Sequence, residues 1–590
     1  MWQRQFKKWF LAYQQAALVQ QERRLILLSG ELTWSIALVN SVIAQENSLC
    51  HIYSDHSLLA NSMGLQSYRH QLGTESQYVI FADSQFNIDA LAALSGTLVA
   101  GGVLFVLLPA TTIADDNAFM QRFFQQLERM PSHVVIEQAQ QLEQIELLLA
   151  QQCDVESNPV LSDASLSSPI AQLAYGCLTQ EQVQAVEAIC KVMQGHRNRP
   201  LVLTADRGRG KSSALAIACS QLVLAQQVSA NSHKLHIVIS AAHVKALTVF
   251  FKQLALSLPQ AVQLANKVTY DGHLIEFLPI DQLIAEKVSA SLVLVDEAAA
   301  LPVYLLAQLL NQYHRLVFAS TVHGYEGAGR GFSIKFQKII AQRYPQWQKL
   351  HVNQPMRWRE QDPLEKFIFE LCLLNADLLS LPTVIEQEQT LLSSSALDWQ
   401  LITTAELLAN EALLQQVFSV LVIAHYQTKP SDLKLLLDNP NVYLHCVTRQ
   451  QQIVAVALLI KEGQVSSDEL LAVQQGRRRL PNQFIPQSLL VHCGQSQAFD
   501  FSYLRISRIA VHPECQQQGI GAFLLNKIAS YALAQGVDFV GTSFGINEEL
   551  AQFWCKADYK LVRLGFNQDA ASGEHSALML TAITAKSQLL

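Results

Sequence analysis

The chain has 590 residues, of which 50% are hydrophobic and 15% are charged. This length exceeds what one hydrophobic core can hold, and the composition excludes an intrinsically disordered protein. The formal net charge is −7, from 42 Lys and Arg against 49 Asp and Glu, which argues against a general nucleic-acid binder. Any RNA contact must therefore come from a local basic patch.

The N-terminal 170 residues show the pattern of an α/β unit. Strand-like runs occur at Leu25–Leu28, Tyr78–Phe81 and Val103–Leu108, with helical stretches between them. The segment Ala90–Ala110 carries no charge and is about as long as a membrane span. Gly101-Gly102 divides it, so we expect a helix-like piece followed by a buried strand and no membrane span. A polar stretch at 154–169 predicts the end of this unit.

The ten cysteines lie far apart, and none shows C-x-x-C spacing, which argues against a zinc site. The first 24 residues lack the apolar core of a signal peptide. We therefore expect reduced thiols and a cytoplasmic protein.

Alternating helix-like and strand-like runs resume at residue 171 and continue to about residue 375. Four apolar runs in this part predict buried parallel strands: Leu201–Thr204, His236–Ser240, Leu292–Val295 and Leu316–Ser320. A looser stretch at 378–398 predicts the next linker.

A phosphate-binding loop follows the first of these strands. It has Walker A spacing with alanine at the first glycine position, and comprises Ala205, Asp206, Arg207, Gly208, Arg209, Gly210, Lys211 and Ser212. Glycine is needed at 208 and 210 because side chains there would keep backbone N–H groups from the phosphates. Lys211 is suited to the β- and γ-phosphates, and the Ser212 hydroxyl to Mg²⁺.

The strand at 292–295 ends in Asp296-Glu297, the pattern of a Walker B motif. Asp296 is the candidate Mg²⁺ ligand, and Glu297 is the candidate base for the attacking water. Gln182 has two interpretations: a contact to the adenine base, or part of a helix N-cap formed with Thr179. Arg330, in a glycine-rich loop, is a candidate γ-phosphate contact.

Residues 376–590 show an α+β pattern. Val442–Thr448 and Ile453–Ile460 predict a hairpin, and Leu504–Val511 is a strand that leads through His512-Pro513 into a glycine turn and a helix. The turn resembles the Q/R-x-x-G-x-G/A motif of the GNAT acetyltransferases. A helix opening of this kind offers free N–H groups to the pyrophosphate of CoA. The candidate acetyl-CoA-binding residues are Ile509, Ala510, Val511, Gln516, Gln517, Gln518, Gly519, Ile520, Gly521 and Ala522.

Glu549 and Lys556 in a following helix are further candidates for cofactor contact. The alternative is an ordinary surface pair on an amphipathic helix.

A P-loop core followed in one chain by a GNAT core resembles the tRNA(Met) cytidine acetyltransferases. The resemblance covers most of the chain and includes Gly324-Tyr325-Glu326-Gly327, the Asp296-Glu297-Ala298-Ala299 box, His425-Tyr426 and Ser572-Gly573-Glu574-His575-Ser576. It implies an N-terminal Rossmann-like α/β domain (1–170), a RecA-like P-loop ATPase with a parallel sheet (171–375), and a GNAT domain with a short C-terminal tail (376–590).

The resemblance also implies a reaction: N4-acetylation of the wobble cytidine of elongator tRNA(Met), with acetyl-CoA and with ATP or GTP. In that family the position of Lys556 holds an arginine, so this chain keeps the charge and loses the bidentate fork. The RNA contact has two interpretations. Arg477, Arg478 and Arg479 form the best local basic patch, and the alternative is a solvated loop.

The exocyclic amine of cytosine is a poor nucleophile, so transfer needs orientation and a proton acceptor. We expect direct attack on acetyl-CoA, with His425 as the first candidate base and Tyr426 beside it. His512 is the second candidate, although a structural role at a strand end is favoured. Two alternatives stay open: acetylation of a protein or small amine, and a nucleotide-gated RNA-binding protein without acetyl transfer.

Overall fold

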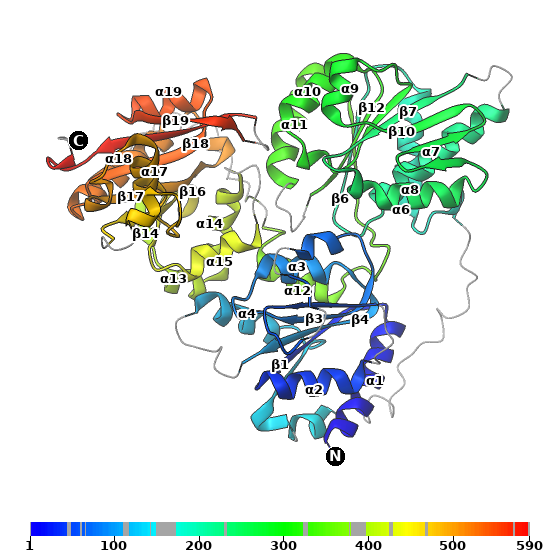
Figure 1. Cartoon of the computed structure of the whole chain (residues 1–590), viewed down its shortest axis with the longest axis horizontal. Helices are drawn as coiled ribbons and strands as arrows, with labels where there is room; N and C mark the ends of the chain where they lie inside the picture. The colour runs from blue at the N-terminus through cyan, green and yellow to red at the C-terminus, as the bar shows by residue number, and fades with distance from the viewer. Residues whose placement is uncertain are drawn as a thin grey trace. The chain divides into compact units, whose positions relative to one another are not determined.

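In the computed structural model the described residues are 2–43, 49–59, 62–64, 67–109, 117–141, 143–148, 173–228, 233–322, 329–376, 378, 397–423, 429–465, 470–569 and 573–587. The chain forms two compact units (Figure 1). The first contains residues 1–374 with 429–431, and the second contains residues 375–428 with 432–590.

The N-terminal part of the first unit is a five-stranded parallel sheet with helices on both faces. The strand order is β2 (Cys50–Ser54), β3 (Ser76–Ala82), β4 (Leu98–Leu108), β1 (Arg24–Ser29), β5 (Val134–Glu137). Figure 1 shows α1 (Trp2–Val19) and α2 (Leu32–Val42) on one face of the sheet. The other face carries α3 (Ile88–Ser95), α4 (Ala118–Glu128) and α12 (Pro363–Cys372). Helix α12 therefore packs with this sheet, although it follows the ATPase strands in sequence.

The apolar segment 90–110 differs in detail from the expectation. Helix α3 ends at Ser95 and β4 begins at Leu98, so the glycine pair lies inside the strand and does not divide helix from strand. The pairing of β4 with β3 shifts register there. A Cβ on Gly101 would lie 2.9 Å from the Leu18 Cβ, so the glycine lets α1 approach a bulge in the sheet. Among the described residues, no helix is both long and apolar enough to cross a membrane.

The second part of the first unit is an eight-stranded sheet. Its order is β13 (Gln348–Val352), β6 (Leu201–Ala205), β12 (Leu316–Thr321), β11 (Leu292–Val295), β7 (His236–Ser240), β10 (His273–Phe277), β9 (Lys267–Tyr270), β8 (Val262–Leu264). Strands β13 to β10 are parallel, and β9 and β8 are antiparallel additions. The four predicted strands are confirmed as β6, β7, β11 and β12. Because parallel strands end at the same edge, their carboxyl ends bring the P-loop and the Asp296-Glu297 pair together.

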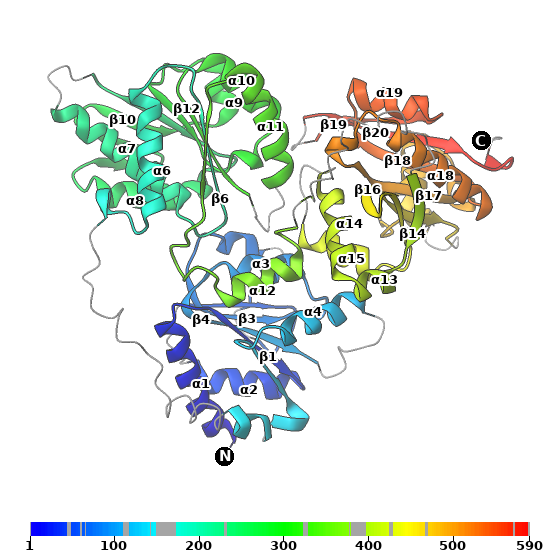
Figure 2. The same cartoon turned by 180° about the vertical axis from the view of Figure 1, so that it is seen from behind.

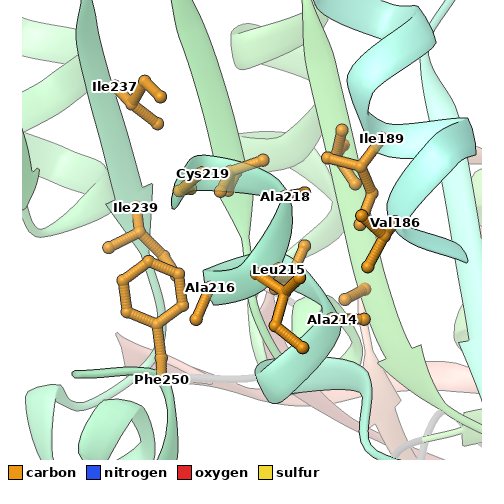
Figure 3. Packing of buried hydrophobic residues seen from close by; sticks show 14 of the residues in the cluster. Val186, Ile189, Ala214, Leu215, Ala216, Ala218, Cys219, Ile237, Ile239 and Phe250 are labelled. Carbon is orange, nitrogen blue, oxygen red and sulfur yellow. The ribbon is translucent and has the colours of Figure 1, made fainter. Parts of the chain in front are cut away.

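Helices cover both faces of this sheet (Figure 2). One group is α6 (Gln180–Gln194), α7 (Lys211–Val228) and α8 (Thr248–Ser257); the other is α9 (Ile280–Glu286), α10 (Val303–Gln312) and α11 (Gly329–Arg343). Figure 3 shows the core under the first group, where α7 inserts small residues such as Ala214 and Ala218 between α6 and the sheet. These alanines let the P-loop helix lie close to β6, which supports the loop from behind.

The second unit is a seven-stranded sheet. Its order is β14 (Leu397–Ile402), β15 (Val442–Arg449), β16 (Gln452–Gly463), β17 (Ser502–Val511), β18 (Phe539–Gly545), β20 (His575–Ala582), β19 (Lys560–Gln568). All neighbours are antiparallel except β17 and β18. The predicted hairpin is confirmed as β15 and β16. The fold is therefore the predicted multidomain α/β architecture with an α+β acetyltransferase unit.

Two hydrophobic cores lie on opposite faces of this sheet. One is under α18 (Ile520–Ala534) and α19 (Glu548–Lys556), and the other is under α16 (Leu470–Gln474) and α17 (Phe484–Cys493). Neighbouring residues of β17 and β18 alternate between the two cores, as strand geometry requires. The unit also contains α13 (Thr404–Ala409), α14 (Glu411–Ile423) and α15 (Pro430–Asp438).

Because of buried His445, we expect the stability of the second unit to fall at acidic pH. Its ring is fully buried against Trp399 and Tyr531, and among the described residues neither ring nitrogen has a hydrogen-bond partner. Burial lowers the pKa of His445 to about 4. The unfolded chain, with a pKa of about 6.5, then binds a proton that the folded chain does not, so stability is complete above about pH 6.5 and falls as the pH drops toward about 4.

We expect His445→Phe to remove this dependence, because phenylalanine does not bind a proton. The change should be tolerated, because no hydrogen bond is lost with the ring nitrogens. When the pH is lowered from about 7.5 to about 5, the unfolding free energy of the wild type should fall by roughly 2 kcal/mol more than that of the variant. Denaturant unfolding of both proteins at the two pH values measures it. Equal pH dependence in the two proteins would contradict the assignment.

Candidate functional site

The P-loop connects β6 to α7. Gly208 has φ 78° and Gly210 has φ 74°, values that favour glycine. The Lys211 side chain is buried, and its Nζ donates to the Asp206 carbonyl at 3.4 Å. The loop thus combines backbone N–H groups, a helix N-terminus and a lysine ammonium, which together suit the phosphates of a nucleotide.

The predicted Mg²⁺ ligands lie within contact distance of each other. The Ser212 Oγ donates to Asp296 Oδ2 at 2.6 Å, and Asp296 is fully buried at the end of β11. Burial, reinforced by the neighbouring Glu297 carboxylate, raises the pKa of Asp296 to about 6, against the lowering effects of Ser212 and Lys211. A buried carboxylate beside a hydroxyl is the oxygen-ligand set that Mg²⁺ prefers, so these residues fit the ion.

Glu297 is positioned by a residue whose role the sequence does not reveal. The Thr321 hydroxyl, at the end of β12, lies 2.9 Å from both carboxylate oxygens of Glu297. Glu297 itself has φ 47°, an uncommon conformation for a non-glycine residue. At this φ angle the chain leaves the direction of β11, and the carboxylate lies toward Thr321, beside the predicted Mg²⁺ ligands.

Gln182 lies beside the P-loop and also takes part in the helix cap. Its backbone N–H donates to Thr179 Oγ1, and its side-chain oxygen accepts from the Leu178 N–H. A Cβ added to Gly210 would lie 3.1 Å from Gln182 Nε2. The N-cap interpretation is confirmed, and the side chain also lies next to the P-loop; nucleotide contact stays a prediction.

The P-loop is braced by the segment between β13 and α12. The Arg209 guanidinium, which is 6% exposed, pairs with Glu365 at 3.0 Å. Trp358 Nε1 donates to the same carboxylate and packs its ring against Gly208. The Trp358 ring also contacts the buried guanidinium of Arg23, 3.3 Å from the ring centroid. Arg23, just before β1, and residues before and within α12 thus set the position of the loop.

Glu365→Gln is expected to raise the Michaelis constant for nucleotide about tenfold, equivalent to about 1.4 kcal/mol of binding free energy. The reason is that a buried guanidinium loses its counter-charge and the loop shifts. Glu370→Gln in the same helix is the matched control, because its pair with Lys366 spans 3.9 Å at the surface. Steady-state hydrolysis kinetics compare the two variants, and identical Michaelis constants would contradict the bracing role.

The second candidate site lies where two strands of the second sheet separate. Strands β17 and β18 pair only from Tyr503 to Ile506, and then β18 continues with β20 while β17 stays with β16. The register shift between β16 and β17 leaves Ser507 without a partner in the ladder. Ile509–Val511 pair with Ala455–Ala457 of β16 and with no residue of β18, so the edge of β17 on the β18 side is not paired with a strand there. That edge offers backbone N–H and C=O groups to an extended chain such as pantetheine.

The loop after β17 presents unused N–H groups at the start of α18. Gly519, with φ 80°, is the N-cap, and no side chain caps this helix. Gln516 and Gln518 are exposed and hold the loop through hydrogen bonds to the carbonyls of Val511 and Glu514. Gln517 is exposed, with φ 62°, and Ala522 is exposed on the first turn of α18. Free amides at a helix N-terminus fit a pyrophosphate.

Two residues from other elements complete this loop. Arg449, at the end of β15, donates to the Gln518 side chain at 3.3 Å and to the Cys515 thiol at 3.0 Å. A Cβ added to Gly521 would lie 3.1 Å from the ring of Phe553 in α19, so a small residue is needed there. Arg449 adds a positive charge to the site; it was not among the predicted residues, because nothing in its local sequence marks it.

The remaining predicted residues differ in how the structure places them. Glu549 and Lys556 are exposed at the two ends of α19, and no ion pair joins them among the described side chains. His512 is buried, and its Nδ1 accepts from the Glu514 N–H, which favours the structural interpretation. Arg477, Arg478 and Arg479 are exposed after α16. His425, Tyr426 and the Arg330 side chain lie outside the described residues.

Three family models match successive parts of the chain. They are the N-terminal model of tRNA(Met) cytidine acetyltransferase TmcA over residues 1–138, the helicase-domain model of RNA cytidine acetyltransferase NAT10/TcmA over 202–375, and GNAT acetyltransferase 2 over 416–536 and 532–584. The tRNA(Met) cytidine acetyltransferase TmcA of Nitrosococcus halophilus is 33% identical over 98% of this chain and 77% of the relative. The chain belongs to the TmcA family.

Other TmcA proteins support the assignment. That of Vibrio cholerae is 35% identical over 97% of this chain and 75% of the relative, and that of Haemophilus influenzae is 30% identical over 90% and 80%. As a TmcA-family enzyme the chain has a helicase-like domain, which implies nucleotide binding, and an acetyltransferase domain, which implies acetyl-CoA. The P-loop and the place where β17 and β18 separate lie within these two matched regions.

Proposed function

We propose that this chain transfers the acetyl group of acetyl-CoA to N4 of the wobble cytidine of elongator tRNA(Met), with ATP or GTP hydrolysis and Mg²⁺. The observation that carries the proposal is that one chain matches a cytidine acetyltransferase helicase-domain model, a GNAT acetyltransferase model and TmcA relatives along nearly its whole length. A protein acetyltransferase would have no need of the helicase-like domain, and an RNA-binding protein without transfer would have no need of the acetyltransferase domain.

In the nucleotide site, Lys211 and the loop amides neutralise the phosphates. Glu297, oriented by Thr321, accepts a proton from the attacking water. Ser212 and Asp296 would hold Mg²⁺, which would supply charge stabilisation for the departing phosphate. Gln182 and Arg330 are the proposed contacts to the base and the γ-phosphate. Hydrolysis is proposed to move the anticodon stem, so that the target base leaves its stack.

In the acetyl site, the amides after Gly519 hold the pyrophosphate, and the Ile509–Val511 backbone holds the pantetheine arm. A backbone N–H of this strand polarises the thioester carbonyl, and the cytosine amine attacks it directly. The N4–C bond forms as the C–S bond of the thioester breaks, and coenzyme A leaves as the thiolate, which takes up a proton. Acceptance of the amine proton is assigned to His425, with Tyr426 beside it. Glu549 and Lys556 are proposed cofactor contacts, and Arg477–Arg479 a proposed RNA contact.

The decisive experiment incubates the protein with acetyl-CoA, ATP and total tRNA, then digests the RNA and measures N4-acetylcytidine by mass spectrometry. A signal that requires both cofactors is expected, and replacing ATP with GTP tests nucleotide choice. No N4-acetylcytidine from protein that hydrolyses ATP and binds acetyl-CoA would reject the proposal. Acetyl transfer to added protein or polyamine instead of tRNA would favour the alternative substrate class.

A further inference from the structure

A groove of about 660 Å³ lies at the amino ends of the ATPase strands, at the opposite end of the sheet from the P-loop. Its lining comes from the residues that immediately precede β7, β11 and β12, together with the end of α6 and the loop after α9. Because parallel strands share one direction, their amino ends lie at one edge and their carboxyl ends, which carry the P-loop, at the other. The groove is therefore separate from the nucleotide site.

The groove is lined by basic side chains. Four of the fourteen lining residues are Lys or Arg, two are His, and none is Asp or Glu; the basic members are Arg197, Lys234, Lys287, Arg315, His233 and His314. The chain as a whole has more acidic than basic residues, 49 against 42. Among the described residues, Lys234 of the lining pairs with a carboxylate, that of Asp271 at 3.5 Å. Both side chains of this pair are about half exposed. A basic surface in an acidic chain points to an anionic ligand.

Two lining residues carry buried polar atoms that have no partner among the described residues. They are Nε of Arg315 and Oε1 of Gln312. Arg315 is half-buried and forms no ion pair with a described residue. A guanidinium that is partly removed from water without a counter-charge is unfavourable, and an anion with several acceptor oxygens would satisfy it.

The form of the groove favours a phosphodiester backbone over a free nucleotide. It lacks the glycine-rich loop that cradles a terminal phosphate, which this domain carries at its other edge. Its tyrosine, Tyr313, is buried and donates its hydroxyl to the carbonyls of Leu283 and Val288, so this ring is not offered to a base; the exposed rings of the lining are the imidazoles of His233 and His314. With four Lys and Arg in the lining, the main interaction that the groove offers is with phosphates, which is independent of sequence.

We propose that this groove binds the phosphodiester backbone of tRNA. The proposal rests on the proposed function, because it takes its RNA from that reaction. A tRNA held here leaves the P-loop free to bind and release nucleotide, so RNA and nucleotide bind at opposite edges of one sheet.

The test compares the full chain with the variant Arg197→Gln/Lys287→Gln, which removes two exposed charges from the groove. Binding of elongator tRNA(Met) is measured at several salt concentrations, together with ATP hydrolysis in the absence of RNA. We expect tRNA affinity to fall about tenfold and the slope of log K against log salt to decrease by about 1 to 2. RNA-independent hydrolysis should be unchanged. Adding Arg315→Gln should weaken binding further.

Lys252→Gln/Arg343→Gln is the matched control, since it removes two exposed charges from the same domain away from the groove. Equal tRNA affinity and salt slope in the groove and control variants would overturn the inference. So would a groove variant that loses inorganic phosphate binding, measured by calorimetry, while tRNA binding stays at the wild-type level. Failure of the wild-type protein to acetylate tRNA, with the groove variant still weaker in tRNA binding, would reject the proposed function and retain the groove.

Discussion

Glu297→Gln will reduce nucleotide hydrolysis by about 10²- to 10⁴-fold and leave nucleotide affinity nearly unchanged. The carboxylate lies at the end of β11, next to the Asp296–Ser212 pair, and its two oxygens are equidistant from the Thr321 hydroxyl. The amide keeps size and hydrogen bonding but cannot accept a proton from water. Phosphate binding should persist, because Lys211 and the loop amides are untouched.

Acetylation of folded tRNA should fall with hydrolysis in this variant if the nucleotide cycle exposes the target base. Phosphate release and N4-acetylcytidine formation, measured in the same reaction, test both statements. Thr321→Val serves as the graded comparison: it removes only the hydroxyl that orients Glu297, so about a tenfold loss is expected. Full hydrolysis by Glu297→Gln would show that another group activates the water. Full acetylation without hydrolysis would separate the two reactions.

Gly519→Val will weaken acetyl-CoA binding about 100-fold and reduce acetylation accordingly, with ATP hydrolysis retained. Gly519 has φ 80°, and a Cβ there would meet no atom within 4 Å, so the defect comes from backbone strain and not from a clash. A β-branched residue in this region costs at least about 1–2 kcal/mol, and relief of the strain turns the first amides of α18 away from the pyrophosphate.

Gly536→Val is a matched control for this change. Gly536, just beyond the other end of α18, has φ 64°, and a Cβ there also meets no atom within 4 Å. Both variants should lose similar thermal stability, and only Gly519→Val should lose acetyl-CoA affinity. Calorimetric titration with acetyl-CoA and thermal unfolding measure the two effects. Equal affinities in the two variants would mean that the α18 N-terminus does not hold the cofactor.

Much of the architecture could be predicted because it is encoded in short segments. A run such as Leu292–Val295 is apolar throughout, so it forms a strand buried on both faces, and the carboxylates that follow it must lie at the sheet edge. The glycines at 208, 210 and 519 mark positive φ angles, which depend on the local backbone alone. Strand, turn and helix N-terminus therefore predict both candidate phosphate-binding loops and the elements on which they lie.

Tertiary structure alone decided which distant residues join these loops. Glu365 pairs with Arg209 across 156 positions, and Arg449 reaches Gln518 across 69, by ion pairing and hydrogen bonding that no local pattern encodes. The basic groove is assembled from loops between residues 193 and 315, each with only one or two cations. Gly101-Gly102 was predicted as a break, but packing of α1 made it a bulge within a strand. Local sequence determines backbone conformation and hydrophobic pattern, whereas charge pairing and close approach depend on which elements the fold brings together.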